Sequence, residues 1–169
     1  SGPIEATING NDRLFNTFTK AVNATNNDGD TVTVTEDLNQ TARFNPFLGQ
    51  AAPGANNVVI DGDGNPAVNI SGQANTPYID LGTNDNTTVS GLTFEANGAS
   101  IIAVGDGSSG SKNATVTDTT FLNFTGSSVI DLDPQDANSN APTTTLARNE
   151  INGSQSDTDG ILVEGDNLG

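Results

Sequence analysis

The sequence predicts an all-β fold in which short strands stack into three parallel sheets around one elongated core, a solenoid with a capping α-helix at its N-terminal end. Short apolar segments recur in one order along the chain, and asparagine, glycine and threonine fill the intervals between them. No segment of the repeated region is long enough for a helix. We expect one domain over residues 1–169, with the capping helix over 12–25 and about five turns, or rungs, over 30–169.

The predicted capping helix rests on one apolar stripe. Its members fall at helical spacing and are Leu14, Phe15, Phe18, Ala21 and Val22. Asn11 or Asp12 can act as the N-cap, because either side chain accepts hydrogen bonds from the first amides of a helix. The open end of a solenoid must be covered, so we expect this helix to cover it; an ordinary surface helix is the alternative.

The repeats begin with a strand near Asp30, where Val32 and Val34 alternate with threonine. Later copies start with Asn-x-x followed by isoleucine or valine, at Asn57, Asn86 and Asn113, 29 and 27 residues apart. A weaker copy starts 30 residues further on, at residue 143. This recurrence predicts a repeat architecture.

Each copy contains three short strands, and none can bury its apolar face alone, so equivalent strands should stack in register. The first predicted apolar column is Val32, Ile60, Val89, Val116 and Leu146. The second is Phe44, Ile70, Phe94, Phe121 and Ile151. The third is Leu81, Val104, Leu132 and Val163, with the isoleucines that precede them.

These features resemble the right-handed parallel β-helix of the pectate-lyase-like superfamily, over roughly residues 12–169. The helix followed by residues 28–34 is similar to the entry of that fold, and residues 57–64 are similar to its next turn. The resemblance implies a right-handed three-sheet parallel β-helix. It implies no single activity, because the superfamily includes lyases, hydrolases, phage tailspikes and adhesin stalks.

The composition limits the classes of partner. The formal net charge is -16 at pH 7, with 21 acidic and 5 basic residues and no histidine. Such a surface repels nucleic acid and anionic lipid, so we expect neither nucleic-acid binding nor membrane insertion. The absence of cysteine excludes disulfides and thiol chemistry within the chain.

Calcium is the one cofactor that the sequence suggests. Asp61, Asp63 and Asn65 space oxygen ligands as the beginning of a calcium loop does. The distal glutamate of an EF-hand is missing, because Gly72 occupies its position. Asp-Gly pairs are also common in turns, so a plain turn is the alternative.

Catalytic residues are not expected. Residues 157–160 are similar to the Asn-Thr-Asp-Gly motif of polygalacturonase-type hydrolases, with Asp159 as the corresponding acid, but Asp157 replaces the asparagine. No paired-aspartate motif follows, although inverting hydrolysis needs two carboxylates. A lyase of this superfamily would need an arginine or lysine base, and Arg148 is the best placed of the five basic residues.

The expected function is therefore non-catalytic: a structural or adhesive module of a secreted or cell-surface protein, of the adhesin or autotransporter-passenger type. The alternative is a polysaccharide-binding or polysaccharide-degrading domain assisted by calcium. Acids from three adjacent turns that converge beside an arginine would favour the enzyme. Flat lateral faces lined by threonine and asparagine would favour the structural module, and a threonine ladder would add the binding of ice or another crystal surface.

The expected partners are a polysaccharide or a host or cell-surface ligand. No capping segment follows the last apolar strand, so we also expect further turns of the same chain, or a partner, to cover the C-terminal end. This predicts that the chain is the N-terminal part of a longer protein, located outside the cell or at its surface.

Overall fold

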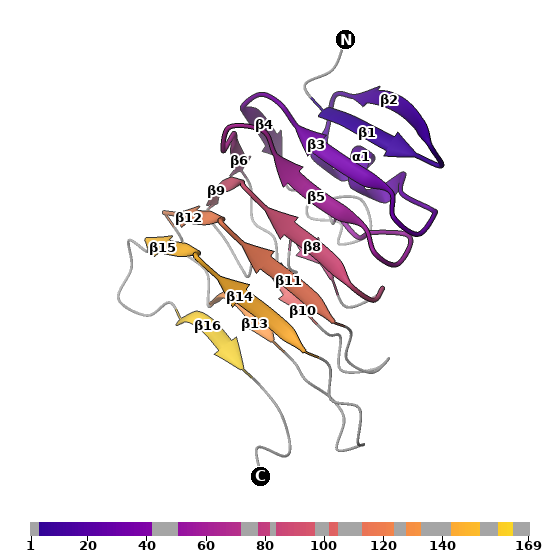
Figure 1. Cartoon of the computed structure of the whole chain (residues 1–169). Helices are drawn as coiled ribbons and strands as arrows, with labels where there is room; N and C mark the ends of the chain where they lie inside the picture. The colour runs from indigo at the N-terminus through magenta and orange to yellow at the C-terminus, as the bar shows by residue number, and fades with distance from the viewer. Residues whose placement is uncertain are drawn as a thin grey trace.

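The computed structural model of the chain is built almost entirely of short β-strands, which step down the molecule from the N-terminal to the C-terminal end (Figure 1). It describes residues 4–41, 51–71, 78–81, 84–96, 102–104, 113–123, 128–132, 143–152 and 159–163. Phe44, from the second predicted column, lies outside these ranges.

The strands form three sheets. The seven-stranded sheet contains β1 (Ile4–Ile8), β2 (Asn11–Phe15), β3 (Thr31–Val34), β5 (Val59–Gly62), β8 (Thr87–Ser90), β11 (Ala114–Thr117) and β14 (Thr144–Ala147). The five-stranded sheet contains β4 (Leu38–Thr41), β6 (Ala67–Ser71), β9 (Thr93–Ala96), β12 (Thr120–Leu122) and β15 (Glu150–Asn152). The four-stranded sheet contains β7 (Ile79–Asp80), β10 (Ile102–Val104), β13 (Ser128–Leu132) and β16 (Asp159–Val163).

Equivalent strands of successive copies pair in parallel, and in the seven-stranded sheet the predicted register is confirmed. The residues that pair across β3, β5, β8, β11 and β14 are Val32, Ile60, Val89, Val116 and Leu146. The first four are fully buried, because alternation along a strand turns every second side chain toward the core.

The second column differs from the prediction by two residues. Val68, and not Ile70, pairs with Phe94, while Leu38 of β4 pairs with Val68 at the beginning of the column. Both Val68 and Ile70 are buried, since they lie two positions apart on one strand and share its inward face. The hydrophobic pattern therefore identified the correct face of β6 but not its register.

A row of aromatic rings links the helix α1 (Phe18–Asn23) to the repeats. The ring of Phe18 stacks on Tyr78 at 5.7 Å between centroids and meets Phe94 edge to face at 6.1 Å. Phe94 in turn stacks on Phe121 at 5.8 Å. These rings fill the core between the sheets, where Phe18, Phe94 and Phe121 are fully buried.

The predicted capping helix over residues 12–25 is wrong in extent. Residues 11–15 instead form β2, which pairs antiparallel with β1. The turn between them is Asn9-Gly10, with φ values of 51° and 72°, as a two-residue hairpin turn with a left-handed backbone requires. Leu14, assigned to the buried stripe, is 58% exposed. The helix begins only at Phe18, where the hydroxyl oxygen of Thr17 accepts a hydrogen bond from the Lys20 amide.

The fold-class prediction, a right-handed three-sheet parallel β-helix with a capping helix, is also wrong in that form. The seven-stranded sheet is mixed and not parallel throughout, because β1 pairs antiparallel with both β2 and β3. The three sheets are open: within the described ranges none closes on itself into a continuous helix of strands. The structure supports a mostly β architecture of mixed and parallel sheets with one short helix.

Candidate functional site

The outward side chains of the seven-stranded sheet form two rows that cross its parallel strands. The first row is Thr31, Val59, Thr88, Thr115 and Thr145, and the second is Thr33, Asp61, Ser90, Thr117 and Ala147. We call these ten residues the threonine face. They flank the buried column on either side, because neighbouring residues of a strand point to opposite faces.

The threonine face is nearly neutral although the chain carries a net charge of -16. Its one charged residue is Asp61, and the Asp61 carboxylate accepts a hydrogen bond of 2.6 Å from the Ser90 hydroxyl of the next strand. All of its residues are partly buried except Thr145, which is exposed. This face therefore offers hydroxyl and methyl groups to solvent rather than charge.

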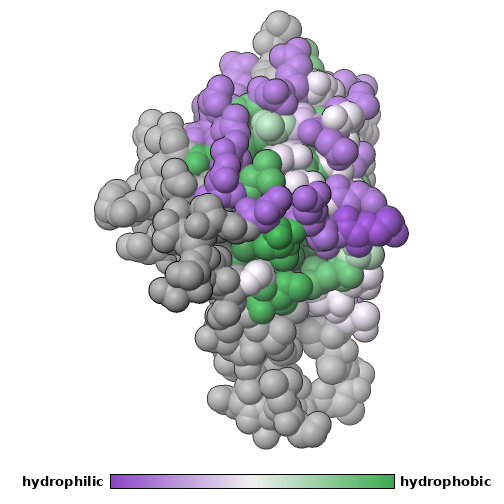
Figure 2. Space-filling view, turned by 90° about the vertical axis from the view of Figure 1, so that its left-hand side faces the viewer, coloured by the Kyte–Doolittle hydropathy of each residue, from purple (hydrophilic) through white to green (hydrophobic). Residues whose placement is uncertain are grey.

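The five-stranded sheet carries a different polar surface. Asn69 donates a side-chain hydrogen bond of 3.3 Å to Asn39, and Asn123 donates one of 2.6 Å to Glu95. Viewed from this side, hydrophilic residues cover the N-terminal part of the molecule, and hydrophobic residues gather further down (Figure 2).

A ladder of aspartate and asparagine side chains joins successive copies just before the strands of the seven-stranded sheet. The Asp28 carboxylate accepts from the Asn56 amide at 3.2 Å, and the Asn56 side-chain oxygen accepts from the Asp85 amide at 2.9 Å. The Asp85 carboxylate accepts from the Asn113 amide at 2.8 Å, and the Asn113 side-chain oxygen accepts from the Thr143 amide at 2.7 Å. We call Asp28, Asn56, Asp85 and Asn113 the Asx ladder.

The Asx ladder repeats one hydrogen bond, which we call the joint, from each copy to the next. Each bond satisfies a backbone amide of the following copy, at a sequence separation of 28 to 30 residues. Of the predicted repeat starts Asn57, Asn86 and Asn113, only Asn113 belongs to the ladder. The repeat pattern does not reveal the other members, because aspartate alternates with asparagine there and because Asn56 and Asp85 lie one position before the conspicuous asparagines.

The chain turns sharply at the other end of these strands. The residues that follow β8, β11 and β14 are Gly91, Asp118 and Arg148, with φ values of 62°, 51° and 53°. Glycine, asparagine and aspartate tolerate this left-handed conformation best. Arg148 is the only other residue type that adopts it in the described part of the chain.

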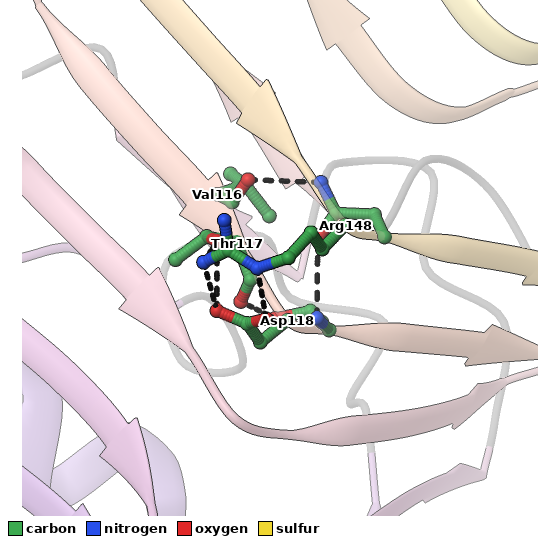
Figure 3. A network of polar contacts seen from close by, with 6 residues as sticks. Val116, Thr117, Asp118 and Arg148 are labelled. Carbon is green, nitrogen blue, oxygen red and sulfur yellow. Dashed lines mark hydrogen bonds and ion pairs between the residues drawn. The ribbon is translucent and has the colours of Figure 1, made fainter.

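Arg148 is held by the preceding corner (Figure 3). Its Nε donates to Asp118 Oδ1 at 2.6 Å, and its Nη2 donates to Asp118 Oδ2 at 2.7 Å and to the Thr117 hydroxyl at 3.0 Å. The Arg148 hydrogen bonds lower the pKa of the Asp118 carboxyl to about 2. The same pairing raises the pKa of Arg148, so its guanidinium is a poor candidate for a catalytic base.

The predicted calcium ligands lie around the end of β5. Asp61 is on the strand and contacts Ser90, while Asp63 and Asn65 are exposed in the turn that follows. Gly64 and Asn65 have φ values of 81° and 57°, as tight turns require. No group of three or more histidine, cysteine, aspartate or glutamate side chains that could hold a metal occurs in the described ranges. Calcium binding here stays a prediction.

Asp30 is buried, 4% exposed, and holds three separate amides. Its Oδ1 accepts from Asn9 N at 2.8 Å, and its Oδ2 accepts from Asn26 N at 2.9 Å and from Asn27 N at 3.0 Å. Burial by itself raises the pKa of this carboxyl, but the amide donors outweigh burial and lower the pKa. Asp30 therefore fixes the hairpin turn and the turn after α1 to the beginning of β3.

The hydrolase-like motif, residues 157–160, lies only partly within the described ranges. Asp159 begins β16, whereas Asp157 lies outside the described ranges. The one helix of those ranges, α1, has six residues, and no helix there is both long and apolar enough to cross a membrane.

Comparisons of the chain with protein-family models, with curated proteins and with solved structures found no match. The resemblance to the pectate-lyase-like superfamily therefore stays a prediction.

Proposed function

We propose that the chain is a non-catalytic structural module of a secreted or cell-surface protein, with lateral faces available for adhesion. The observation that carries this proposal is the Asx ladder. One side-chain-to-backbone bond recurs between successive copies, alongside parallel strand pairing in the same register. A repeated joint of this kind is typical of proteins in which each unit contacts only its neighbours and the assembly serves as an extended support.

The lateral faces also support this proposal over the polysaccharide-degrading alternative. A lyase needs a base near acids that bind a cation, but Arg148 is paired with Asp118 at the edge of the threonine face. The remaining outward positions of that face are mainly hydroxyl and methyl groups. Substrate sites are typically concave, so flat hydroxyl-lined faces suit contact with a surface better than cleavage of a chain.

We place an expected partner at the outer edges of β14, β15 and β16, which lie at the same end of the three sheets. Leu146 and Ile151 are only partly buried there, and Ile161 is 45% exposed, while the residues paired with them, Val116, Phe121 and Ile130, are fully buried. Apolar side chains beside a strand edge that pairs with no other described strand favour the addition of further strands. Further strands of the same chain, or a partner protein, would provide them.

The structural role is tested by breaking the Asx ladder. Asp85→Ala removes the acceptor for the Asn113 amide, and Asp63→Ala is the matched control, since it removes the same charge from an exposed turn outside the ladder. We expect Asp85→Ala to lower the unfolding force in single-molecule pulling and Asp63→Ala to leave it unchanged. Equal forces for the two variants would contradict the proposal.

The non-catalytic part is tested with acidic polysaccharides such as polygalacturonate and alginate, with and without calcium. We expect neither unsaturated products nor new reducing ends. Turnover that disappears in Arg148→Gln would contradict the non-catalytic role and would favour the lyase alternative.

The proposed location is tested by labelling intact source cells with an antibody against the module. Labelling only after lysis would contradict this location.

A further inference from the structure

The first row of the threonine face extends beyond the parallel strands into β1. Thr7 of β1 pairs with Thr31, so the row extends into the antiparallel hairpin. The complete row is Thr7, Thr31, Val59, Thr88, Thr115 and Thr145. Five of its six positions are threonine, and the exception, Val59, has the shape of threonine with a methyl group in place of the hydroxyl.

Three hydroxyls of the two rows donate to carboxylates, and one of them belongs to the first row, since Thr7 donates to Asp12 Oδ1 at 2.8 Å. Ser90 and Thr117 of the second row donate to the carboxylates of Asp61 and Asp118. By contrast, the Thr88 and Thr115 hydroxyls have no partner in the part of the chain that the structure describes. Each can therefore donate one hydrogen bond and accept two from outside the protein.

The spacing of the face is set by the sheet. Neighbouring strands lie about 4.8 Å apart, and residues two positions apart on one strand, such as Thr88 and Ser90, lie about 6.7 Å apart. In ice, water molecules form a tetrahedral network with O–H···O bonds of about 2.75 Å, and this geometry gives lattice repeats of about 4.5 Å and about 7.3 Å. The spacings of the threonine face differ from these two repeats by about a tenth or less. Rotation of the threonine side chains can compensate for this difference.

We infer that the threonine face binds the surface of ice, with the hydroxyls of β8 and β11 as its centre. These adjacent strands give an uninterrupted block of four, Thr88, Ser90, Thr115 and Thr117. The Thr88 and Thr115 hydroxyls replace water molecules of the lattice, and the threonine methyl groups fit between them. Ser90 and Thr117 donate to Asp61 and Asp118, so their hydroxyls take part as acceptors. Val89 and Val116, fully buried directly beneath, fix the backbone that carries the block.

The lack of free charge favours this ligand over an ionic or acidic one. A charged group would impose its own tightly held hydration shell on the contact, whereas the Asp61 carboxylate is already engaged by Ser90. Elsewhere the chain is strongly acidic, so the neutral face is the part of the surface suited to an uncharged lattice. This activity goes beyond the proposed structural role and does not depend on it.

The test measures thermal hysteresis and the shape of single ice crystals with the purified chain. We expect a hysteresis gap and faceted crystals from the wild type. Thr115→Tyr places a bulky ring at the centre of the face and should abolish both effects. Thr120→Tyr is the matched control, because Thr120 occupies β12 of the five-stranded sheet, and it should retain them.

A gain-of-function variant makes the test sharper. Val59→Thr completes the row without changing the size of the side chain and should widen the hysteresis gap. Melting curves of all variants confirm that each is folded. Absence of hysteresis in the folded wild type would overturn the inference, as would equal loss in Thr115→Tyr and Thr120→Tyr. Binding to crystalline chitin or cellulose without any effect on ice would also overturn it.

Discussion

Replacing Asp30 by asparagine should destabilise the fold by about 3 kcal/mol at neutral pH, although the two side chains have nearly the same shape. The Asp30 carboxylate accepts three backbone hydrogen bonds, one at Oδ1 and two at Oδ2. An amide retains one accepting oxygen and turns an N–H group toward at least one of the three donors. That donor is left without an acceptor in a site where the residue is 4% exposed.

The magnitude follows from the bonds. One hydrogen bond to a charged acceptor is lost, worth roughly 1.5–3 kcal/mol, and the remaining bonds weaken toward the roughly 1 kcal/mol of a neutral pair. Release of the buried charge offsets part of this loss, because a neutral amide costs less to bury than a carboxylate. The remainder is smaller than the roughly 5–15 kcal/mol that stabilises a domain, so the variant should still fold.

The effect should depend on pH in a defined direction. The Asp30 pKa is lowered in the folded chain from an ordinary value of 3.8. Its contribution is therefore fully present above that value and is lost as the pH falls through the folded pKa. The difference between wild type and Asp30→Asn should be constant from neutral pH to about 5 and shrink below about 4.

Urea unfolding followed by circular dichroism, repeated across this pH range, measures the difference directly. Asp63→Asn changes the same charge at an exposed turn and serves as the control for general acid effects. If Asp30→Asn is as stable as wild type at pH 7, or if its deficit persists unchanged at acid pH, the assigned role of the carboxylate is incorrect.

Three further predictions concern single positions. Thr87→Val should stabilise the chain by about 1 kcal/mol, since the Thr87 hydroxyl is buried without a partner in the described residues; an unchanged or lower melting temperature would argue against this. Gly62→Ala should prevent stable folding, because its new Cβ would lie 2.1 Å from a backbone oxygen of the next copy. Gly64→Ala, at φ +81° in open space, should cost only about 1 kcal/mol, and equal losses would contradict this reading. In carboxyl-carbon NMR, Asp118 should titrate near pH 2 and move toward its ordinary value of 3.8 in Arg148→Gln, whereas identical titrations would show that the ion pair does not form in solution.

The sequence predicted those elements that depend on local hydrophobic pattern. The alternation around Val32, Ile60 and Val89 identified the strands and their inward faces, and the recurrence of the pattern gave their parallel pairing. The register of β6 was harder to predict, because Val68 and Ile70 are both apolar and point to the same face. Only the pairing with β9 shows which of them lies opposite Phe94.

The N-terminal region shows how two local signals can compete. The apolar spacing of residues 14–22 fits a helix, but Asn9-Gly10 is the strongest short-range signal for a hairpin. Residues 11–15 therefore form β2, and β1 pairs with β2 on one side and with β3 on the other. Asp30 adds one bond that exists only in the hairpin arrangement, which its Oδ1 accepts from the Asn9 amide. The helix is thus confined to the residues that remain.

The candidate sites depend on contacts between copies, which no single segment reveals. The Arg148–Asp118 pair joins residues 30 positions apart, and the free hydroxyls of the threonine face become a surface only when the strands are aligned. Sequence could suggest threonine recurrence, but it could not tell which hydroxyls are occupied by aspartates.

The Asx ladder has a consequence for how such a chain can change in length over generations. Each joint connects a residue to its counterpart 28 to 30 positions later, so duplication or loss of one whole copy leaves every remaining joint intact. A shorter insertion just before a strand would instead separate an acceptor from its amide and unpair the strands on both sides. Genes of this type should therefore vary by complete copies, and the length of the molecule can be adjusted without redesign of its core.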